Sequence, residues 1–226
     1  SQNKMLEAIV ILKQALKSFG VNLPNNPTEI SPLPEIIKFK LKFGKRQTED
    51  LLNHTLTTEK KSLAIMGLLN ALSAPAFLAQ PALFPVIVLK MVNFSLTHGN
   101  TPLSPFAYAA FGIIQGSALG DFEAGYKFGK LALDLIKKIG EQTKPIECRT
   151  YFLFATMINH WKHHAKENKA LYNHAFEKGM EAGDLQYGSY SLNNIFFQGV
   201  MIRENLSILS ENFIKYRKSI LSLQQH

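Results

Sequence analysis

A run of imidazoles offers the most reactive side chains in this sequence. It reads His160-Trp161-Lys162-His163-His164. On a helix, His160 and His164 would stand one turn apart on the same face, a spacing that can bind Zn²⁺. Trp161 occupies the position where a metalloprotease carries its general-base glutamate, and a third ligand would have to be as remote as His174. We therefore expect no metal, and we interpret the run as a helix end where cationic side chains suit the negative dipole.

Trp161 has two interpretations. It is a core residue beside Phe152 or Phe154, which is the more common place for a single tryptophan, or it anchors a peptide in a groove. In the second case Trp161, His160 and His164 would form part of a binding surface.

A second candidate binding surface is basic. Its five positive charges within nine residues are Lys38, Lys40, Lys42, Lys45 and Arg46. The ordinary interpretation is a solvated edge, and the functional one is a docking site for an acidic or phosphate-bearing partner. The whole chain carries a formal charge of +8. Since no aromatic-rich RNA motif or zinc-finger spacing accompanies this charge, nucleic-acid binding stays a third hypothesis.

Motifs of common catalytic centres are missing from the sequence. Gly44-Lys45 lacks the preceding glycine of a phosphate-binding loop, and Glu123 follows Asp121-Phe122 where a kinase would carry glycine. The single cysteine, Cys148, forms no disulfide within the chain, which favours a reducing cytoplasm. We expect no catalytic residue and no cofactor.

The periodicity of the apolar residues predicts an all-α chain of about eleven helices joined mostly by short loops. Glycine and proline set most of the boundaries, and a short helix capped by Thr48 lies among the longer ones. The predicted ranges of those longer helices are 2–19, 36–43, 58–74, 81–96, 104–118, 121–139, 145–163, 167–182, 185–201 and 204–223.

One short phrase occurs twice between helices. It reads Gly120-Asp121-Phe122 and Gly183-Asp184-Leu185, 63 residues apart, which corresponds to about two helix pairs. Glycine and aspartate at these positions predict tight turns that start a helix. The pattern indicates stacked antiparallel helix pairs, a tetratricopeptide-like α-solenoid, and such repeats usually serve as scaffolds.

Residues 62–120 contain one formal charge, at Lys90. Pro75, Pro81 and Pro85 interrupt this stretch and leave pieces of ordinary helix length, so we expect no membrane span. Helices with so little charge are either sandwiched within the fold or form a docking surface.

Roughly residues 85–190 resemble the helical-repeat region of large bacterial multidomain signalling kinases. The resemblance rests on Leu89-Lys90-Met91-Val92, Ser95-Leu96, His98-Gly99-Asn100, Tyr108, Gly112, the stretch from Gly120 to Leu133, His160-Trp161 and the residues from Tyr172 to Asp184. In that family a protein-kinase-like module and an AAA/STAND-type ATPase precede the region, and GAF and histidine-kinase modules often follow it.

The resemblance implies a single helical-repeat domain over 1–226, with 1–80 less regular and 81–226 built of tetratricopeptide-like pairs, taken from a longer protein. Its implied role is a non-catalytic scaffold, whose partners are another protein or the neighbouring kinase and ATPase modules. An alternative from another class is a small-molecule sensor, with a closed cavity lined by Phe, Tyr and His inside the stack.

Overall fold

The fold is known from a computed structural model that describes residues 2–223, with the side chains of 2–214 and 217. The described residues form α-helices with short 3₁₀ and π segments, and within 2–223 the only β feature is an isolated bridge between Leu56 and Asn100. The predicted all-α class is confirmed. The chain divides into two compact units, Ser1–Leu135 and Ile136–His226, which are described separately.

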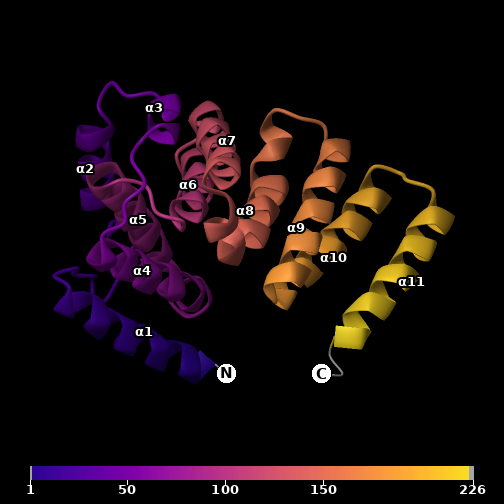
Figure 1. The fold of residues 1–226 in the computed structure, drawn as a ribbon, viewed down its shortest axis with the longest axis horizontal. Helices are drawn as coiled ribbons and strands as arrows, with labels where there is room; N and C mark the ends of the chain where they lie inside the picture. Colours follow the sequence, from indigo (N-terminus) through magenta and orange to yellow (C-terminus); the bar gives the residue numbers. More distant parts are fainter. Residues whose placement is uncertain (1, 224–226) are drawn as a thin grey trace. The chain divides into compact units, whose positions relative to one another are not determined.

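The first unit is organised around a central helix, α5. Helices α2, α4 and α6 pack on α5, and α1 lies along α4 (Figure 1). The bounds are α1 (Gln2–Ser18), α2 (Leu33–Phe43), α3 (Thr48–Leu52), α4 (Lys60–Ala79), α5 (Phe84–His98) and α6 (Ser104–Ile113). A π segment follows at Ile114–Ala118, and α7 (Phe122–Ile139) runs across the boundary between the units.

The nearly uncharged helices α5 and α6 of this unit are largely buried. Nine of the ten residues of α6 are buried, and α5 buries Val86 to Leu89 as well as Met91 to Asn93. Stretches Lys60–Ala79 and Pro81–His98 are long and apolar enough to cross a membrane, a test that core helices of soluble proteins also pass. The burial of α5 and α6 against their neighbours accounts for their apolar character.

Gly99, Asn100 and Tyr108, which belong to the residues that carry the family resemblance, form a turn and its hydrogen bonds. Gly99, at φ +96°, approaches Thr55 so closely that a Cβ would lie 2.6 Å from the Thr55 carbonyl oxygen. The Asn100 backbone N–H donates to that carbonyl at 2.8 Å, and the Asn100 amide donates to the Leu51 carbonyl at 2.7 Å. The Tyr108 hydroxyl donates to Asn100 Oδ1 at 3.0 Å. These residues therefore fix the loop after α3 to the end of α5.

Two predicted boundaries in this unit were wrong. Helix α4 continues through Pro75 to Ala79 instead of ending near Ala74, because the apolar positions on both sides of the proline, Leu72 and Ala76, are fully buried. The short helix α3 is preceded by Gln47, whose backbone N–H donates to Asp50 at 2.8 Å, so Thr48 is not its cap.

The second unit is a succession of helices in chain order, α8 (Lys144–Met157), α9 (Asn168–Ala182), α10 (Leu185–Met201) and α11 (Leu206–Leu223), each packed on the next (Figure 1). Helices α9 and α10 approach most closely at two glycines. A Cβ on Gly179 would lie 3.0 Å from Gly188 Cα and 2.9 Å from Cys148 Sγ on α8. Small residues therefore allow three helices to meet at one point.

The repeated Gly-Asp phrase forms the same turn twice. Gly120 and Gly183 have φ of +74° and +75°, and each following aspartate caps a helix. Asp121 accepts from the Ala124 N–H at 2.9 Å, and Asp184 accepts from the Tyr187 N–H at 3.3 Å. Three α-helices, α7 to α9, separate the two turns, so the expected two helix pairs between them are wrong. A regular helix-pair repeat would place an even number of helices there.

Candidate functional site

The histidine run does not form the predicted pair of ligands. Helix α8 ends at Met157, and His160 lies in a 3₁₀ turn, Asn159–Trp161. His164 precedes the next 3₁₀ turn, and its Nδ1 accepts from the Lys166 N–H at 3.1 Å. The expectation that His160 and His164 share a helix face is therefore wrong. No group of three or more His, Cys, Asp or Glu that could hold a metal ion occurs within residues 2–223.

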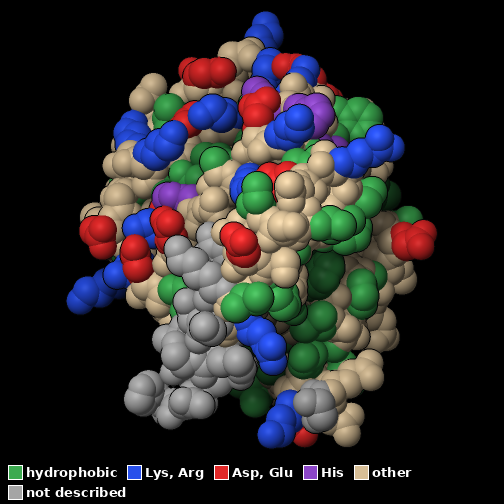
Figure 2. All heavy atoms as spheres, turned by 90° about the vertical axis from the view of Figure 1, so that its right-hand side faces the viewer, with side chains coloured by type: hydrophobic (Ala, Val, Ile, Leu, Met, Phe, Trp, Pro, Cys, Tyr) green, Lys and Arg blue, Asp and Glu red, His purple; other side chains and the backbone are tan. Residues whose placement is uncertain are grey.

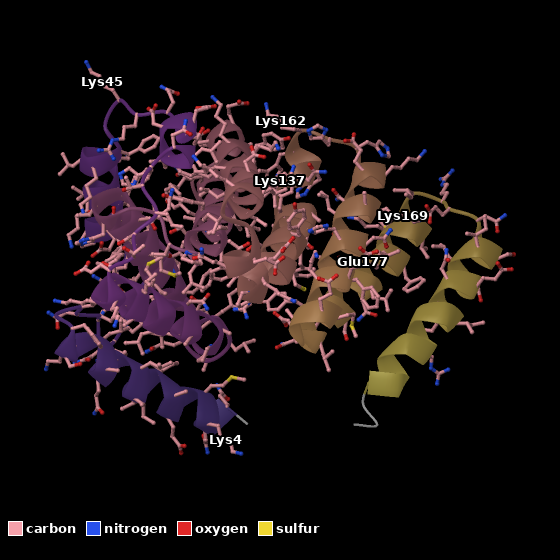
Figure 3. All side chains as sticks on the ribbon, in the orientation of Figure 1. Lys4, Lys45, Lys137, Lys162, Lys169 and Glu177 are labelled. Carbon is pink, nitrogen blue, oxygen red and sulfur yellow. The ribbon has the colours of Figure 1, made fainter. Side chains whose placement is uncertain are left out.

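The other residues near this run have structural partners. Trp161 is half-buried, with its ring centroid 5.7 Å from that of His160. His174 contacts Glu147 at 2.7 Å, and its ring lies tilted against that of Tyr151, with ring centroids 4.1 Å apart. Lys162, the central residue of the run, is exposed (Figure 3). The structure thus brings Trp161 and His160 together, while His174 pairs with Glu147.

The predicted basic surface divides into two parts. Lys38 and Lys42 lie one turn apart on α2 and line a pocket that residues of α5 also line. Lys40 is not among the residues that line this pocket, and Lys45 and Arg46 lie in the loop after α2. Lys42 Nζ donates to the Thr97 hydroxyl and, at 3.3 Å, to the Asn93 carbonyl. Only Lys38 and Lys42 therefore belong to a built site.

That site centres on a buried carboxylate, Glu35. Its Oε1 accepts from Lys38 and from Lys90 at 2.9 Å each, and its Oε2 accepts from the Asn93 amide at 3.0 Å. Burial by itself raises the pKa of Glu35, but the hydrogen bonds from Lys90 and Lys38 outweigh it and hold the pKa below its ordinary value. The one formal charge of α5 is thus neutralised by α2.

Beside Glu35 lies an open pocket of about 200 Å³, here called the α2–α5 pocket. Its polar lining includes Lys38, Lys42, Lys90 and Asn93, and its apolar lining includes Ile65. Because Glu35 pairs with both Lys38 and Lys90, this pocket already supplies one negative charge to its three lysines.

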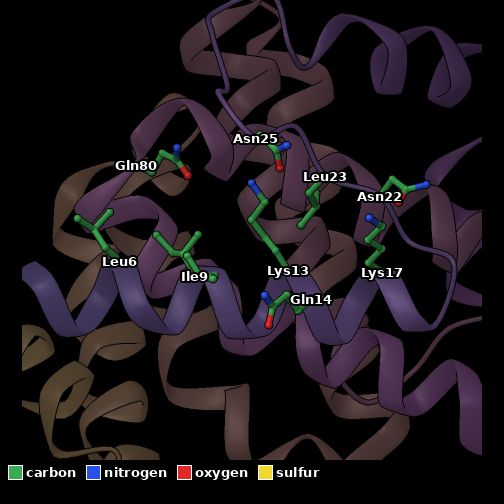
Figure 4. A pocket seen from close by; sticks show the side chains of 10 residues that line it. Leu6, Ile9, Lys13, Gln14, Lys17, Asn22, Leu23, Asn25 and Gln80 are labelled. Carbon is green, nitrogen blue, oxygen red and sulfur yellow. The ribbon is translucent and has the colours of Figure 1, made fainter.

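A larger pocket, here called the α1 pocket, lies between α1, the loop after it and the end of α4 (Figure 4). Its volume is about 360 Å³ and it opens to solvent. It is lined by Leu6, Ile9, Val10, Lys13, Gln14, Lys17, Asn22, Leu23, Asn25 and Gln80. These residues combine an aliphatic floor, two lysines and four amides, unlike the aromatic and histidine lining expected for a sensor cavity.

Lys13 is the most perturbed cation of the α1 pocket. Desolvation by burial lowers the pKa of its ammonium group. Its Nζ donates to a neutral acceptor, the Pro24 carbonyl, at 2.6 Å. Asn22 also lines the α2–α5 pocket, so the two pockets adjoin at this residue.

Sequence reasoning missed a large apolar surface on α10 and α11. Nine large hydrophobic side chains between 185 and 214 are exposed, among them Phe197 and Met201 at 67% and 68%. We call them the α10–α11 surface; they are Leu185, Tyr190, Phe197, Val200, Met201, Leu206, Ile208, Phe213 and Ile214. Figure 2 shows hydrophobic side chains gathered on the face where α11 lies. The sequence did contain a signal, because the apolar residues of α10 and α11 are spread over more of each helix than one buried face requires.

The environment of Cys148 does not favour a nucleophilic thiolate. Cys148 is buried on α8, and burial raises the pKa of its thiol to about 12. At neutral pH it is a protonated core residue.

Comparison with known proteins gives one similarity to report. Over 118 residues, which are 52% of this chain, the sequence is 26% identical to "Hybrid signal transduction histidine kinase G" from Dictyostelium discoideum. No family model matches the chain, and no solved structure matches it. The chain spans 3% of that relative's length. Because the relative is eukaryotic, a bacterial origin stays a prediction. The similarity supports, at this coarser level, a segment related to a signalling kinase.

Proposed function

We propose that this chain is a non-catalytic helical scaffold that mediates contacts between modules of a signalling kinase or ATPase. The similarity to a small part of a long signalling histidine kinase supports the setting. The observation that carries the role is the α10–α11 surface, because soluble proteins rarely leave so many large apolar side chains together in water.

The occupant that we propose for this surface is another segment of the same signalling polypeptide. A relative of which the chain covers 3% contains many other segments. The surface is rich in flexible and aromatic apolar side chains, Met201 and Phe197 among them, and such residues are typical of protein–protein contacts. A contact of this kind would make the helices relay the relative position of attached modules.

The test is photo-cross-linking in the intact protein within its host cell. A benzophenone amino acid replaces Phe197 in one variant and Ile30, exposed at 70% in the first unit, in the control. Cross-linked peptides are identified by mass spectrometry. The proposal predicts peptides from another segment of the same polypeptide at 197 and few at 30. Peptides from a second copy of this segment, from an unrelated protein, or none at 197 would contradict it.

A small-molecule sensor remains the second candidate function. The observation that favours it is the α1 pocket, whose volume lies within the range of ligand sites.

A further inference from the structure

Two lysine-lined pockets of the first unit differ in one respect. The α2–α5 pocket contains a carboxylate, Glu35, that pairs with Lys38 and Lys90. The α1 pocket contains Lys13 and Lys17, and none of its described lining residues is Asp or Glu. In the first pocket one carboxylate pairs with two of the three lysines, whereas the described lining of the second pocket offers its two lysines no carboxylate.

Lys13 is the lysine of the α1 pocket that is most affected by the absence of a lining carboxylate. Burial destabilises its charged form, and the Pro24 carbonyl that accepts its hydrogen bond offers a dipole in place of a negative charge. A partly desolvated ammonium group gains more from an anion than a solvated one does, because the surrounding dielectric constant is lower. The pocket therefore favours a negatively charged group near Lys13 Nζ.

The other residues that line the α1 pocket indicate which chemical groups a ligand would carry besides its anion. Leu6 and Ile9 project from α1 into the pocket beside Lys13, and Leu23, Asn25 and Gln80 close it from the opposite side (Figure 4). Aliphatic groups favour an apolar body, and the amides can donate hydrogen bonds to oxygen atoms. A volume of about 360 Å³ suits a small molecule.

We propose that the α1 pocket binds a small organic anion, whose head group lies at Lys13 and Lys17 and whose apolar body lies on the aliphatic floor. Carboxylates and phosphate monoesters share the required chemistry, an oxyanion on an apolar body. This inference is independent of the proposed scaffold role, since it concerns the first unit and a different surface.

Isothermal titration calorimetry at constant ionic strength tests the proposal with four probes of equal chain length. Hexanoate and hexyl phosphate carry the anionic head group, hexanol has none, and hexylammonium reverses the charge. We expect one of the anions to bind at least about tenfold more tightly than hexanol, the ratio that one hydrogen bond to a charged group provides. Which anion binds better identifies the head group. Equal binding of the anions and hexanol, or no binding of either anion, would overturn the proposal.

Variants locate the site. Lys13→Met removes the charge and shortens the unbranched side chain by only one atom, so the preference for the anion over hexanol should disappear. Lys4→Met makes the same change at an exposed position on α1 outside the pocket lining and should change nothing (Figure 3). Anion preference that survives in Lys13→Met, or that is lost equally in Lys4→Met, would contradict the assignment.

A second variant covers the case in which Lys13→Met weakens the loop through the lost bond to Pro24. Val10 lines the pocket and is 56% exposed, so Val10→Ser leaves the fold intact. It should weaken the binding of hexanoate and hexanol by similar factors, because it removes only apolar contact. Unchanged affinities for both would show that the ligands bind elsewhere.

Discussion

Helices α5–α6 and helices α10–α11 both contain many apolar residues, and they use them in opposite ways. No large hydrophobic side chain described between 84 and 113 is exposed, whereas nine between 185 and 214 are. The single formal charge of α5, Lys90, pairs with Glu35 across a helix contact. A nearly uncharged stretch therefore marks the core of the first unit, and the candidate contact surface lies in a more polar stretch.

The difference arises from neighbours. Helix α5 is contacted by α2, α4 and α6, and most of its residues are buried. Helix α10 packs on α8, α9 and α11 but still exposes Phe197, Val200 and Met201. Composition alone does not distinguish these cases, because a helix apolar on several sides is buried only if enough partners surround it.

The largest expected effect comes from a cavity in the core helix. Leu89→Ala should lower the free energy of unfolding by about 3 kcal/mol, since Leu89 is fully buried in α5. Met201→Ala, at a position 68% exposed, should cost less than about 0.5 kcal/mol. Urea denaturation of both variants measures the contrast. Similar losses in the two would break the distinction between core and surface.

The next effect concerns the charge that the core does contain. Glu35→Gln leaves Lys90 without its carboxylate and should cost about 2 kcal/mol at neutral pH. The exposed Glu29→Gln is the matched control and should be near neutral. Because the folded-state pKa of Glu35 lies below its unfolded value, its contribution is present above the unfolded pKa and is lost as pH falls through the folded pKa. Wild-type and variant stabilities that stay equally far apart in acid would contradict this reading.

The second unit is tested by the glycine crossing of α9 and α10. Gly179→Ala should cost about 2 kcal/mol, because its Cβ would meet Cys148 Sγ at 2.9 Å and the Asp184 carbonyl oxygen at 3.0 Å. In the first unit, Gly67→Ala meets nothing within 4 Å and should stabilise α4 by about 0.5 kcal/mol. Thermal unfolding followed by circular dichroism distinguishes the two. A neutral Gly179→Ala would mean that the helices pack less closely.

The smallest effects come from the two turns. Asp121→Ala and Asp184→Ala each remove a helix cap and should cost about 1 kcal/mol. Asp184 also pairs with Arg149 at 3.5 Å, so its variant should be the more harmful of the two. The reverse order, measured by urea denaturation, would indicate that the Arg149 contact adds no stability.

Local patterns in the sequence predicted much of the fold. Helix α10 begins and ends where the apolar periodicity predicted, and both Gly-Asp phrases form capped turns. The end of α4 was missed because tertiary burial around Pro75 overrides a local helix-breaking signal. Helix α8 was predicted too long, since no strong breaker follows Met157.

The candidate sites were harder to predict, because they depend on which helices become neighbours. The basic run indicated Lys38 and Lys42, but the bonds of Lys42 to Asn93 and Thr97, and of Lys90 to Glu35, were visible only once α2 packed on α5. The α1 pocket joins residues as distant in sequence as Leu6 and Gln80. The α10–α11 surface also required the packing, since exposure is a property of the assembled helices.

Hydrogen–deuterium exchange tests the central claim, that α10–α11 is the contact surface and α5–α6 is core. The intact protein, as its host expresses it, is compared with the isolated chain of 226 residues. The account predicts that amides of α10 and α11 exchange at least about tenfold more slowly in the intact protein, while those of α5 and α6 exchange equally in both. Unchanged exchange in α10–α11, with new protection elsewhere, would contradict it.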